Sequence, residues 1–531
     1  MNAFAALLSK LEQVRSPRRK LALLRAYFTA APSGDAAWAL HLLTGRRPRR
    51  VVSGPELRRW LGEATGLPAE VIEATYAHVG DLAETVALVL GSEKTAHAPA
   101  QEGLQSLLED LIEPLRGAPA PVRQATISAL WARYPRQTRL WLNKLLTGGL
   151  RVGVGEGLTL RALGEAFGLD PDVLQHRWMT PSPPSAAAFR ALVDPQGATL
   201  SWAAPYPFCL AQGLKSEALP EDPEALLAEW KWDGVRCQLV RREGQTALWS
   251  RGRERLEDRF PELLESAQAL ADGTVLDGEL LVWEGDHPGS FADLARRLQR
   301  KRATPALLRS LPCRFLAYDL LELDGIDLRA RPLSTRRARL EALLARAVGT
   351  LHLSPALHAT SWPALRTLRQ GARAQGAEGL MLKRRSAPYA QGRKSDCWWK
   401  WKLDPETVDA ILLYAQPGHG RRANLYTDFT FAVWDGANLV PLAKAYSGLD
   451  EPTLERLDRW IRKNTTERFG PVRAVTPTLV FELAFDSAHA APRRKAGLAL
   501  RFPRIHRWRE DLAAEDADQL ALVKARVLPH G

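Results

Sequence analysis

The chain has 531 residues, too many for one hydrophobic core, so its length predicts about three compact units. Hydrophobic residues make up 46% of the chain and charged residues 25%, a composition typical of soluble globular proteins that excludes a largely disordered chain. The formal net charge of +13 favours a polyanionic partner, although a protein that is merely basic has the same charge.

Targeting and redox signals are weak. The apolar stretches end well short of a membrane span and the N-terminus has no signal-peptide pattern, so we expect a cytoplasmic protein that contacts no membrane. The four cysteines lie far apart and support neither a zinc ribbon nor a disulfide framework, so we expect reduced structural thiols.

The first part of the chain is predicted to be helical. Segments such as KLALLRAYF and PELRRWLGEATG carry apolar residues at spacings of three and four, and residues 180–207 are rich in proline. We therefore place an all-α domain with its linker at residues 1–200.

Two features of this domain could contact phosphate. The basic run GRRPRR at residues 45–50 could grip phosphate or form a solvated turn, and both interpretations stay open. Gly148 and Gly149, followed by Arg151, could present backbone amides to DNA, or they could simply cap a helix.

Strands dominate the rest of the chain. Short alternating segments such as VRCQLVRR and TVLDGELLVW, with helices between them, predict an α+β domain at residues 201–402. Beyond residue 403, closely spaced strands with one inserted helix predict a small β-barrel at residues 403–531. The predicted fold class is thus multidomain: all-α, then α+β, then a barrel.

The stretch EWKWDG at residues 229–234 suggests chemistry. On a strand, Glu229, Lys231 and Asp233 point to one face and the two tryptophans to the other. An exposed ladder of ion pairs would look the same, and each of its pairs would contribute only about 0 to 1 kcal/mol.

Further motifs follow in order: SRGRE from Ser250, LDGEL from Leu276, FLAYDLLELDG from Phe315, EGLMLKRR from Glu378 and WWKWK from Trp398. This ordered set resembles the covalent nucleotidyltransferases, and among them the ATP-dependent DNA ligases. TGGLRVGVGEG near residue 150 resembles their helical DNA-binding domain, and KAGLALRFPRIHRWRED near residue 500 resembles their C-terminal motif. The resemblance implies a nucleotidyltransferase (adenylation) domain followed by an OB-fold barrel.

A lysine amine attacks phosphorus only when it is neutral, although the ordinary lysine pKa is about 10.4. Carboxylates beside such an amine favour its charged form, so neighbouring cations must disfavour it. We expect these cations to be Arg236, Lys383, Lys400, Lys402 and a divalent metal ion.

The resemblance makes Lys231 the nucleophile that takes AMP from ATP. It implies that Asp233 orients the lysine and helps to hold metal, that Glu378 holds metal, and that Glu279 contacts the ribose or the metal. Mg²⁺ is the expected ion, with Mn²⁺ as a substitute, because it keeps several waters and takes only one or two carboxylates.

The resemblance also assigns the nucleotide contacts. Glu229 would read the adenine base, and Tyr318 would stack on it, although a tyrosine in FLAYDL could equally be a core residue. Arg251 would lie near the nucleotide and the DNA end. Phosphate contacts are implied for Lys400 and Lys402, and the nucleotide-binding set also contains Arg236 and Lys383.

The C-terminal motif departs from the family pattern. The family ends this element with Arg-x-Asp-Lys, whereas here Arg509 and Asp511 are followed by Leu512. We expect Arg509 to contact the nucleotide, and Arg501 and Arg504 to contact DNA, with a structural role for the last two as the alternative.

The sequence therefore predicts a monomeric ATP-dependent DNA ligase that seals nicked duplex DNA through lysyl-AMP and a 5′-adenylylated DNA intermediate. Its three-domain plan resembles bacterial members, with roles in DNA repair, recombination and replication. The alternatives are an RNA ligase, a capping-type nucleotidyltransferase, and a catalytically silent DNA-binding scaffold of the same fold. The missing zinc-type cysteine set argues against an NAD-dependent ligase.

Overall fold

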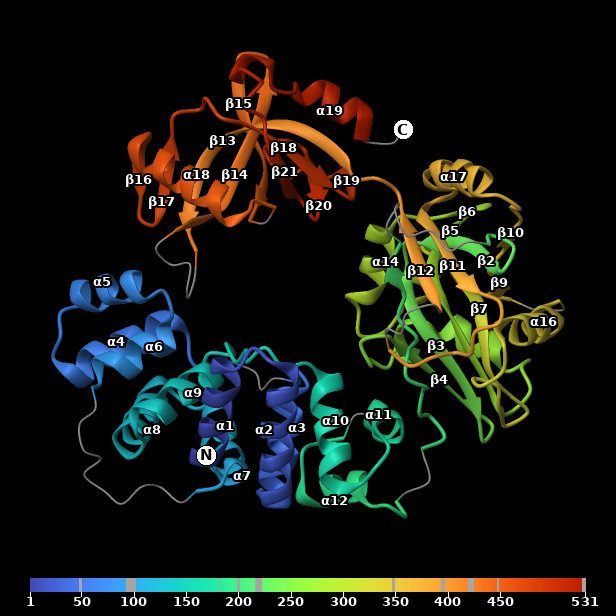
Figure 1. Cartoon of the computed structure of the whole chain (residues 1–531), viewed down its shortest axis with the longest axis horizontal. Helices are drawn as coiled ribbons and strands as arrows, with labels where there is room; N and C mark the ends of the chain where they lie inside the picture. Colours follow the sequence, from blue (N-terminus) through green and yellow to red (C-terminus); the bar gives the residue numbers. More distant parts are fainter. Residues whose placement is uncertain are drawn as a thin grey trace. The chain divides into compact units, whose positions relative to one another are not determined.

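The computed structural model describes residues 1–46, 50–91, 102–180, 182–197, 201–214, 222–345, 349–392, 397–418, 425–446 and 448–527. Part of the GRRPRR run, residues 47–49, lies outside this set. The chain divides into two compact units. One contains Met1–Val14, Arg46–Gly153 and Asp404–Gly531, and the other contains Arg15–Gly45 and Val154–Leu403. Figure 1 labels the helices and strands, coloured in chain order.

The N-terminal region is helical, as predicted. The helices that this region contributes to the first unit include α1 (Asn2–Gln13), α4 (Gly54–Thr65), α5 (Ala69–Val79), α6 (Leu82–Val89), α7 (Leu104–Ser106), α8 (Ala120–Arg133) and α9 (Arg136–Leu146). Helix α9 packs against α1 and α6, and the indole Nε1 of Trp141 donates to Ser9 Oγ at 2.7 Å. The buried face of α9 therefore organises this part of the unit.

The second unit begins with its own helices. These are α2 (Pro17–Ala30), α3 (Ser33–Leu43), α10 (Glu156–Phe167), α11 (Pro171–Met179) and α12 (Ala186–Val193). Helix α10 packs on α2, and α12 packs on α3. Arg253 of the SRGRE segment ion-pairs with Glu156 and donates to the carbonyl of Trp178, so these helices are tied to the α+β part of the same unit.

Two sheets form the α+β part. The smaller has the order β1 (Gln212–Gly213), β12 (Trp398–Lys402), β11 (Ala377–Arg384), β2 (Leu226–Trp232) and β10 (Ala356–Leu357). One of its faces packs with Leu365 of α17 (Trp362–Gly371) in an apolar cluster. This cluster includes Ala228, Leu380, Leu382, Trp399 and Trp401.

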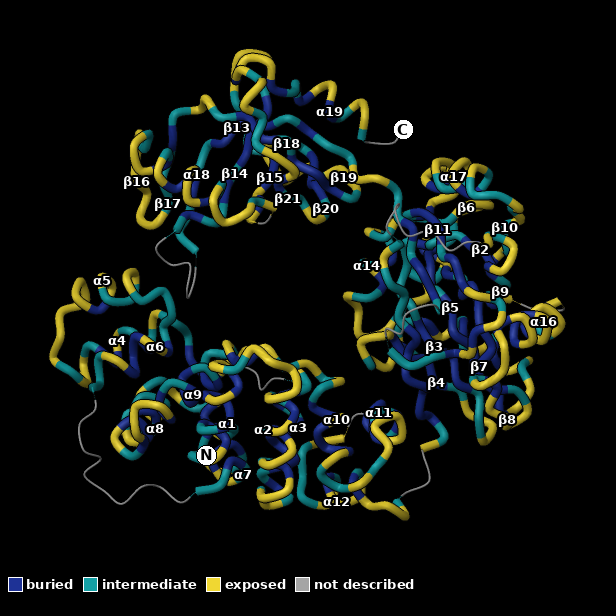
Figure 2. The backbone as a smooth tube through the Cα atoms, viewed as in Figure 1, coloured by how far each residue is buried: buried dark blue, intermediate teal, exposed yellow. Residues whose placement is uncertain are grey.

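The larger sheet has the order β4 (Gln245–Ser250), β3 (Val235–Arg242), β5 (Thr274–Glu284), β7 (Cys313–Leu323) and β8 (Ile326–Asp327). Strand β6 (His287–Pro288) pairs with β5, and β9 (Leu351–Leu353) pairs with β7. The central strands β3, β5 and β7 are largely buried (Figure 2). Helices α13 (Pro261–Ala267), α14 (Phe291–Leu298) and α16 (Leu333–Leu344) contribute to its core, and α15 (Pro305–Ser310) precedes β7.

The C-terminal region is a β domain. A seven-stranded sheet runs β15 (Asn438–Ala445), β14 (Tyr426–Asp435), β13 (Glu406–Pro417), β17 (Val472–Val475), β16 (Thr465–Phe469), and β18 (Val480–Phe485) joins β13 to β21 (Arg504–Trp508). Strands β19 (Ser487–Ala490) and β20 (Leu498–Arg501) pair separately, and helices α18 (Glu451–Lys463) and α19 (Leu520–Val527) complete the domain. Among the described strands the pairing does not close on itself, so the expected OB-fold barrel stays a prediction.

Two expectations about the whole chain can be compared with the structure. Among the residues that it describes, no helix is both long and apolar enough to span a bilayer. The four cysteines are free thiols, and Cys209, Cys237 and Cys313 are buried, in agreement with a structural role.

Candidate active site

Strand β2 presents its charged residues to one face of the smaller sheet. Glu229 pairs with Met381 of β11, and Met381 pairs with Lys400 of β12, so these three side chains point the same way. Trp399 and Trp401 belong to the apolar cluster on the opposite face. The alternation expected for WWKWK, and for the residues of EWKWDG that lie in β2, is therefore confirmed.

Lys231 contacts Glu378. Its Nζ lies 2.5 Å from Glu378 Oε2, and Lys402 Nζ lies 3.5 Å from the same oxygen. Both Glu378 and Gly379 fall opposite Lys231, because the register jumps from the pair Ala377–Trp232 to the pair Leu380–Trp230. This is a β-bulge, in which one extra residue re-aims a side chain.

Glycine makes the turn after Lys231 possible. A Cβ on Gly234 would lie 2.4 Å from the carbonyl oxygen of Leu280 and 2.9 Å from Cγ of Glu279, so no other residue fits without movement. The glycine of the Lys-x-Asp-Gly segment thus lets β2 turn into β3 directly against β5.

Glu279 faces this turn from the larger sheet, where it pairs with Arg236. Burial raises the pKa of Glu279 to about 8, while the charges of Arg236 and Lys231 act in the opposite direction and those of Asp277 and Asp233 add to the rise. Lys231, Asp233 and Glu279 are therefore electrostatic neighbours contributed by two sheets.

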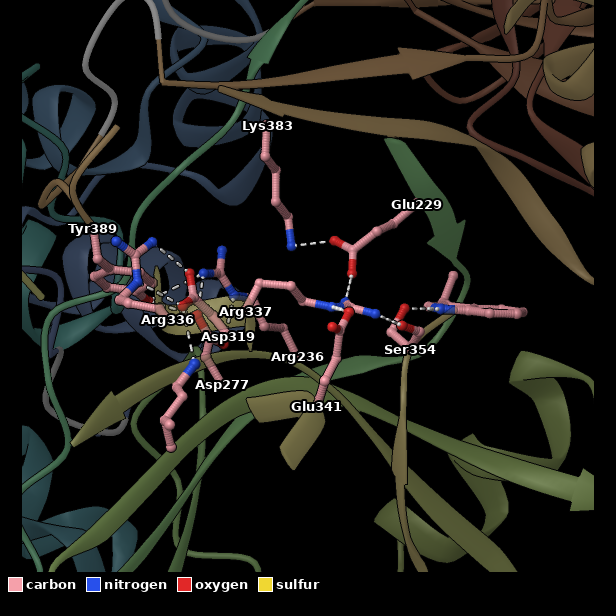
Figure 3. Close-up of polar contacts among 12 residues, drawn as sticks. Glu229, Arg236, Asp277, Asp319, Arg336, Arg337, Glu341, Ser354, Lys383 and Tyr389 are labelled. Atoms are coloured by element: carbon pink, nitrogen blue, oxygen red, sulfur yellow. Dashed lines mark hydrogen bonds and ion pairs between the residues drawn. The ribbon is translucent and has the colours of Figure 1, made fainter. Parts of the chain in front are cut away.

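Glu229 is buried between two cations (Figure 3). Its Oε1 accepts from Nη1 of Arg337 at 2.7 Å, and its Oε2 ion-pairs with Lys383 Nζ. The ammonium of Lys383 also lies 4.1 Å from the ring centroid of Tyr318 and 4.3 Å from that of Trp398. The structure thus gathers Glu229, Lys383 and Tyr318, which the sequence placed in one nucleotide site.

Arg236 has a different environment from the one we expected. Its guanidinium makes a two-pronged contact with Asp277, at 3.1 and 2.6 Å, and donates to the carbonyl of Cys209 and to the hydroxyl of Tyr389. A buried cation needs such partners. Because Asp277 neutralises Arg236 and Glu229 neutralises Lys383, the prediction that both leave net positive charge around Lys231 is not supported.

The remaining basic residues of the predicted nucleotide site are more open. Arg251 is exposed, and its amide donates to the carbonyl of Arg236 at 3.0 Å, which fixes its loop beside β3. Lys400 and Lys402 are half-buried on the face that carries Glu229. These three can reach a bound group more readily than Arg236 can.

Metal ligands were expected at Asp233, Glu279 and Glu378. Over the described part of the chain, no three His, Cys, Asp or Glu side chains form a ready cluster for a metal ion. The three carboxylates are thus not a preformed cage. Their hard oxygens still suit Mg²⁺, which completes its shell with water and phosphate oxygens.

Two of the predicted arginines of the C-terminal domain, Arg509 and Arg504, are held by carboxylates of the same domain. Arg509 contacts Asp409 at 2.8 Å and makes a two-pronged contact with Asp511. Arg504 contacts Asp486 at 2.9 Å. Arg501 lies with its guanidinium carbon 5.4 Å from the ring centroid of Phe502.

Leu512 is half-buried. It packs against an apolar cluster made by Ile411, Val480, Ala514 and Ala517. The departure from the family pattern thus places an apolar side chain in an apolar environment.

The glycine pair after α9 caps the helix. Gly148 has a φ of +72° and its amide donates to the carbonyl of Leu145, while the amide of Gly149 donates to the carbonyl of Lys144 at 2.8 Å. Both amides are used within the chain, so the idea that they are presented to DNA phosphate is wrong and the helix-cap interpretation holds. Arg151, which is exposed, stays a candidate for DNA contact.

No sequence motif pointed to Arg337 or to Arg336 beside it. Arg336 is fully buried and holds Asp319 through two hydrogen bonds of 2.7 and 2.9 Å. Both arginines come from α16, far along the chain from β2, and the Arg-Arg pair in STRRARL looks like any solvated helix face. The one signal is the spacing of Leu333 and Leu340, which lie three or four residues from the two arginines and therefore on the same side of α16. Both leucines are buried, so this side of the helix is internal.

Three family models match the chain. They are DNA ligase N terminus at residues 1–164, ATP dependent DNA ligase domain at residues 209–402, and ATP dependent DNA ligase C terminal region at residues 422–512. The chain belongs to the ATP-dependent DNA ligase family. It is a ligase, and the order of its helical, nucleotidyltransferase and β domains is that of the family.

Relatives match along the whole length of this ligase. A probable DNA ligase of Koribacter versatilis is 30% identical, over 94% of this chain and 92% of its own length. A DNA ligase of Haloarcula marismortui is 28% identical, over 98% and 99% of the two chains. A solved structure named Pmar-Lig_Pre shares the fold, with a TM-score of 0.62 and 15% identity over 96% of this chain and 99% of that one.

Proposed function

We propose that this ligase seals nicks in duplex DNA through a covalent lysyl-AMP intermediate on Lys231. The observation that carries the proposal is the position of Lys231, opposite the Glu378 bulge and facing Glu279 across the two sheets. A lysine and carboxylates on converging strands can bind a nucleotide, orient its phosphate and take the proton from the amine that attacks the phosphorus atom.

Three phosphoryl transfers make up the reaction. Lys231 Nζ forms a bond to the α-phosphorus of ATP while the bond to pyrophosphate breaks, and the amine loses a proton. The 5′-phosphate of the nick then takes AMP and releases the lysine. Finally the 3′-hydroxyl attacks that 5′-phosphorus and AMP leaves. Positioning and charge stabilisation supply most of the rate in such steps.

The residues divide between base, phosphate and metal. Glu229 reads the adenine and Tyr318 stacks on it, while Lys400, Lys402 and Arg251 contact phosphate. Arg236 stays a proposed nucleotide contact while it is ion-paired with Asp277. Lys383, ion-paired with Glu229, belongs to the base pocket and not to the surroundings of the nucleophile.

Glu378, Asp233 and Glu279 would hold Mg²⁺, which supplies positive charge against the phosphate oxygens. In the free protein Glu378 Oε2 accepts a hydrogen bond from the ammonium of Lys231. This ion pair has to open before the amine can attack.

DNA contact is proposed for basic residues of the flanking domains, of which Arg151 is exposed and Arg501 and Arg504 are half-buried. Arg151, Arg501 and Arg504 are the candidates that the sequence named. Phe502, between the two C-terminal arginines, is 63% exposed and has a φ of +53°. An exposed aromatic ring held in this backbone conformation among arginines suits the minor groove of DNA. Arg509, with both its carboxylate partners in place, stays a proposed nucleotide contact.

We further propose that the ligase is a cytoplasmic monomer. The roles typical of its family are DNA repair, recombination and replication.

Transfer of label from the α-phosphate of ATP tests this function. With Mg²⁺, the wild-type chain should retain label through an acid-labile bond, and Lys231→Ala should retain none. Lys301→Ala, a change at an exposed lysine of the same unit, is the matched control and should behave as wild type. Label from GTP or NAD in place of ATP would favour a different nucleotidyltransferase, and no label from any nucleotide would favour a silent scaffold.

A further inference from the structure

Arg337 contacts three groups at once (Figure 3). Its Nη1 donates to Glu229 Oε1, its Nη2 to the backbone carbonyl of Ser354, and its Nε to Glu341 Oε1, each at 2.7 Å. The side chain is buried. A planar guanidinium with a fixed fork of donors is the side chain that can hold such a set rigidly, and lysine is not.

These contacts join the two sheets. Glu229 lies on β2 of the smaller sheet. Ser354 follows β9, and its amide donates to the carbonyl of Ala317, which directly precedes Tyr318 on β7 of the larger sheet. Arg337 therefore sets where the carboxylate of Glu229 stands relative to the ring of Tyr318.

The carboxylate keeps capacity for a ligand. Each of its oxygens has two lone pairs, and Arg337 and Lys383 use one oxygen each. A carboxylate facing two cations can only accept hydrogen bonds, so it complements an amino group. A carbonyl oxygen at the same place would meet the like partial charge of the carboxylate.

We propose that Arg337 is a positioning residue for nucleotide selectivity: by fixing Glu229, it makes the base pocket favour a purine with a 6-amino group over one with a 6-oxo group. This inference rests on the proposed function, in which Glu229 reads the base. Arg337 itself does not touch the reacting atoms.

A purely structural role makes a different prediction. Removing one partner of a buried ion pair destabilises a protein because the other charge stays behind. Such a loss would lower the melting temperature and reduce the rates with all nucleotides alike. Selectivity between ATP and GTP separates the two explanations.

The experiment measures label transfer from ATP and from GTP over a range of concentrations, on the full chain. For Arg337→Met we expect the preference for ATP, taken as the ratio of kcat/KM values, to fall by about tenfold or more, mainly through a higher KM for ATP. Arg337→Lys keeps the positive charge but loses the forked set of donors, so its preference for ATP should lie between those of wild type and Arg337→Met. Arg339→Met changes an exposed arginine of the same helix and should match wild type.

A double-mutant cycle shows whether Arg337 acts through Glu229. In the Glu229→Gln background, Arg337→Met should cause no further loss of preference for ATP. An additive loss would overturn the inference, and so would a folded Arg337→Met chain with the wild-type preference. If Arg337→Met does not fold, Arg337→Lys tests the inference instead. A wild-type preference for ATP in Arg337→Lys would then overturn it.

The two levels of proposal fail separately. A wild-type chain that takes no label from ATP would defeat the proposed function itself. A wild-type chain that is labelled from ATP in preference to GTP, with unchanged selectivity in the Arg337 variants, would defeat only the role of Arg337.

Discussion

Glu378 Oε2 accepts from Lys231 Nζ at 2.5 Å, although the two residues lie 147 positions apart and Glu378 would face away from Lys231 in a regular strand. Leu380 lies in the apolar cluster under α17, and strict alternation would send Glu378 to the same side. The bulge at Glu378 and Gly379 brings the carboxylate to the face of the lysine. Gly379 has a φ of +139°, a conformation that only glycine adopts freely.

Changing Glu378 to alanine tests the importance of this ion pair. We expect nick sealing to slow by about a hundredfold or more, because the carboxylate that orients Lys231 and would hold the metal ion is lost. DNA affinity should stay nearly unchanged, since Glu378 belongs to the chemical site. Sealing of a labelled nicked duplex and a gel-shift titration measure the two quantities.

Glu265→Ala is the control for this change, because Glu265 is an exposed carboxylate on α13 of the same unit. It should seal at the wild-type rate. Normal sealing by the Glu378 variant would remove this residue from the metal site.

Changing Gly379 to alanine tests the bulge itself. A Cβ at this position would lie 2.3 Å from the carbonyl oxygen of Trp401, and the positive φ adds strain of about 1 to 3 kcal/mol. The strands must therefore shift, and Glu378 moves with them. We expect a lower melting temperature together with a loss of label transfer as large as the loss of nick sealing expected for Glu378→Ala.

Gly213→Ala provides the matched comparison, because a Cβ on Gly213, at the edge of the same sheet, would have no atom within 4 Å. It should change neither quantity much. A Gly379 variant that transfers label at the full rate would show that the bulge is not needed to aim Glu378.

The sequence predicted what depends on local pattern. The alternation of EWKWDG and WWKWK fixed which side chains share a face, because the period of a strand is two. The bulge escaped this argument, since one extra residue in β11 breaks the period and only the pairing with β2 reveals it. The glycine in EGLMLK was the one available signal.

The charged partners could not be predicted from pattern either. Arg236 and Lys383 were expected to leave positive charge near the nucleophile, but each is neutralised by a buried carboxylate, Asp277 or Glu229. Burial demands such pairing, yet which partner a cation finds depends on tertiary contacts. Arg337 shows the same limit, because it reaches Glu229 across 108 positions of the chain.

His176 should make stability depend on pH. Burial lowers its pKa from 6.5 to about 4, and the charges of Arg329 and Arg242 act in the same direction, against a small opposing effect of Asp327. The unfolded chain therefore binds a proton more readily than the folded one between pH 6.5 and pH 4. Stability from this group is complete above pH 6.5 and is lost as the pH falls through that window, by up to about 3 kcal/mol.

Comparison of wild type with His176→Asn isolates this effect. The stability difference between the two chains, measured by denaturant titration at several pH values, should shrink as the pH falls from 7 to 4. A stability difference that stays constant over this pH range would mean that His176 is not held neutral.

Leu512→Lys tests the departure from the family pattern. Leu512 packs against Ile411 and Val480, so a lysine there loses part of this contact, although its stem can stay buried while its ammonium reaches water. We expect the unfolding free energy of the β domain to fall by about 1 kcal/mol and label transfer from ATP to stay within about twofold of wild type. Leu512→Met, which keeps the apolar contact, should change neither quantity. A rise of label transfer of about tenfold in the lysine variant, but not in the methionine variant, would contradict this expectation and would favour a first step that lacks a cation at this position.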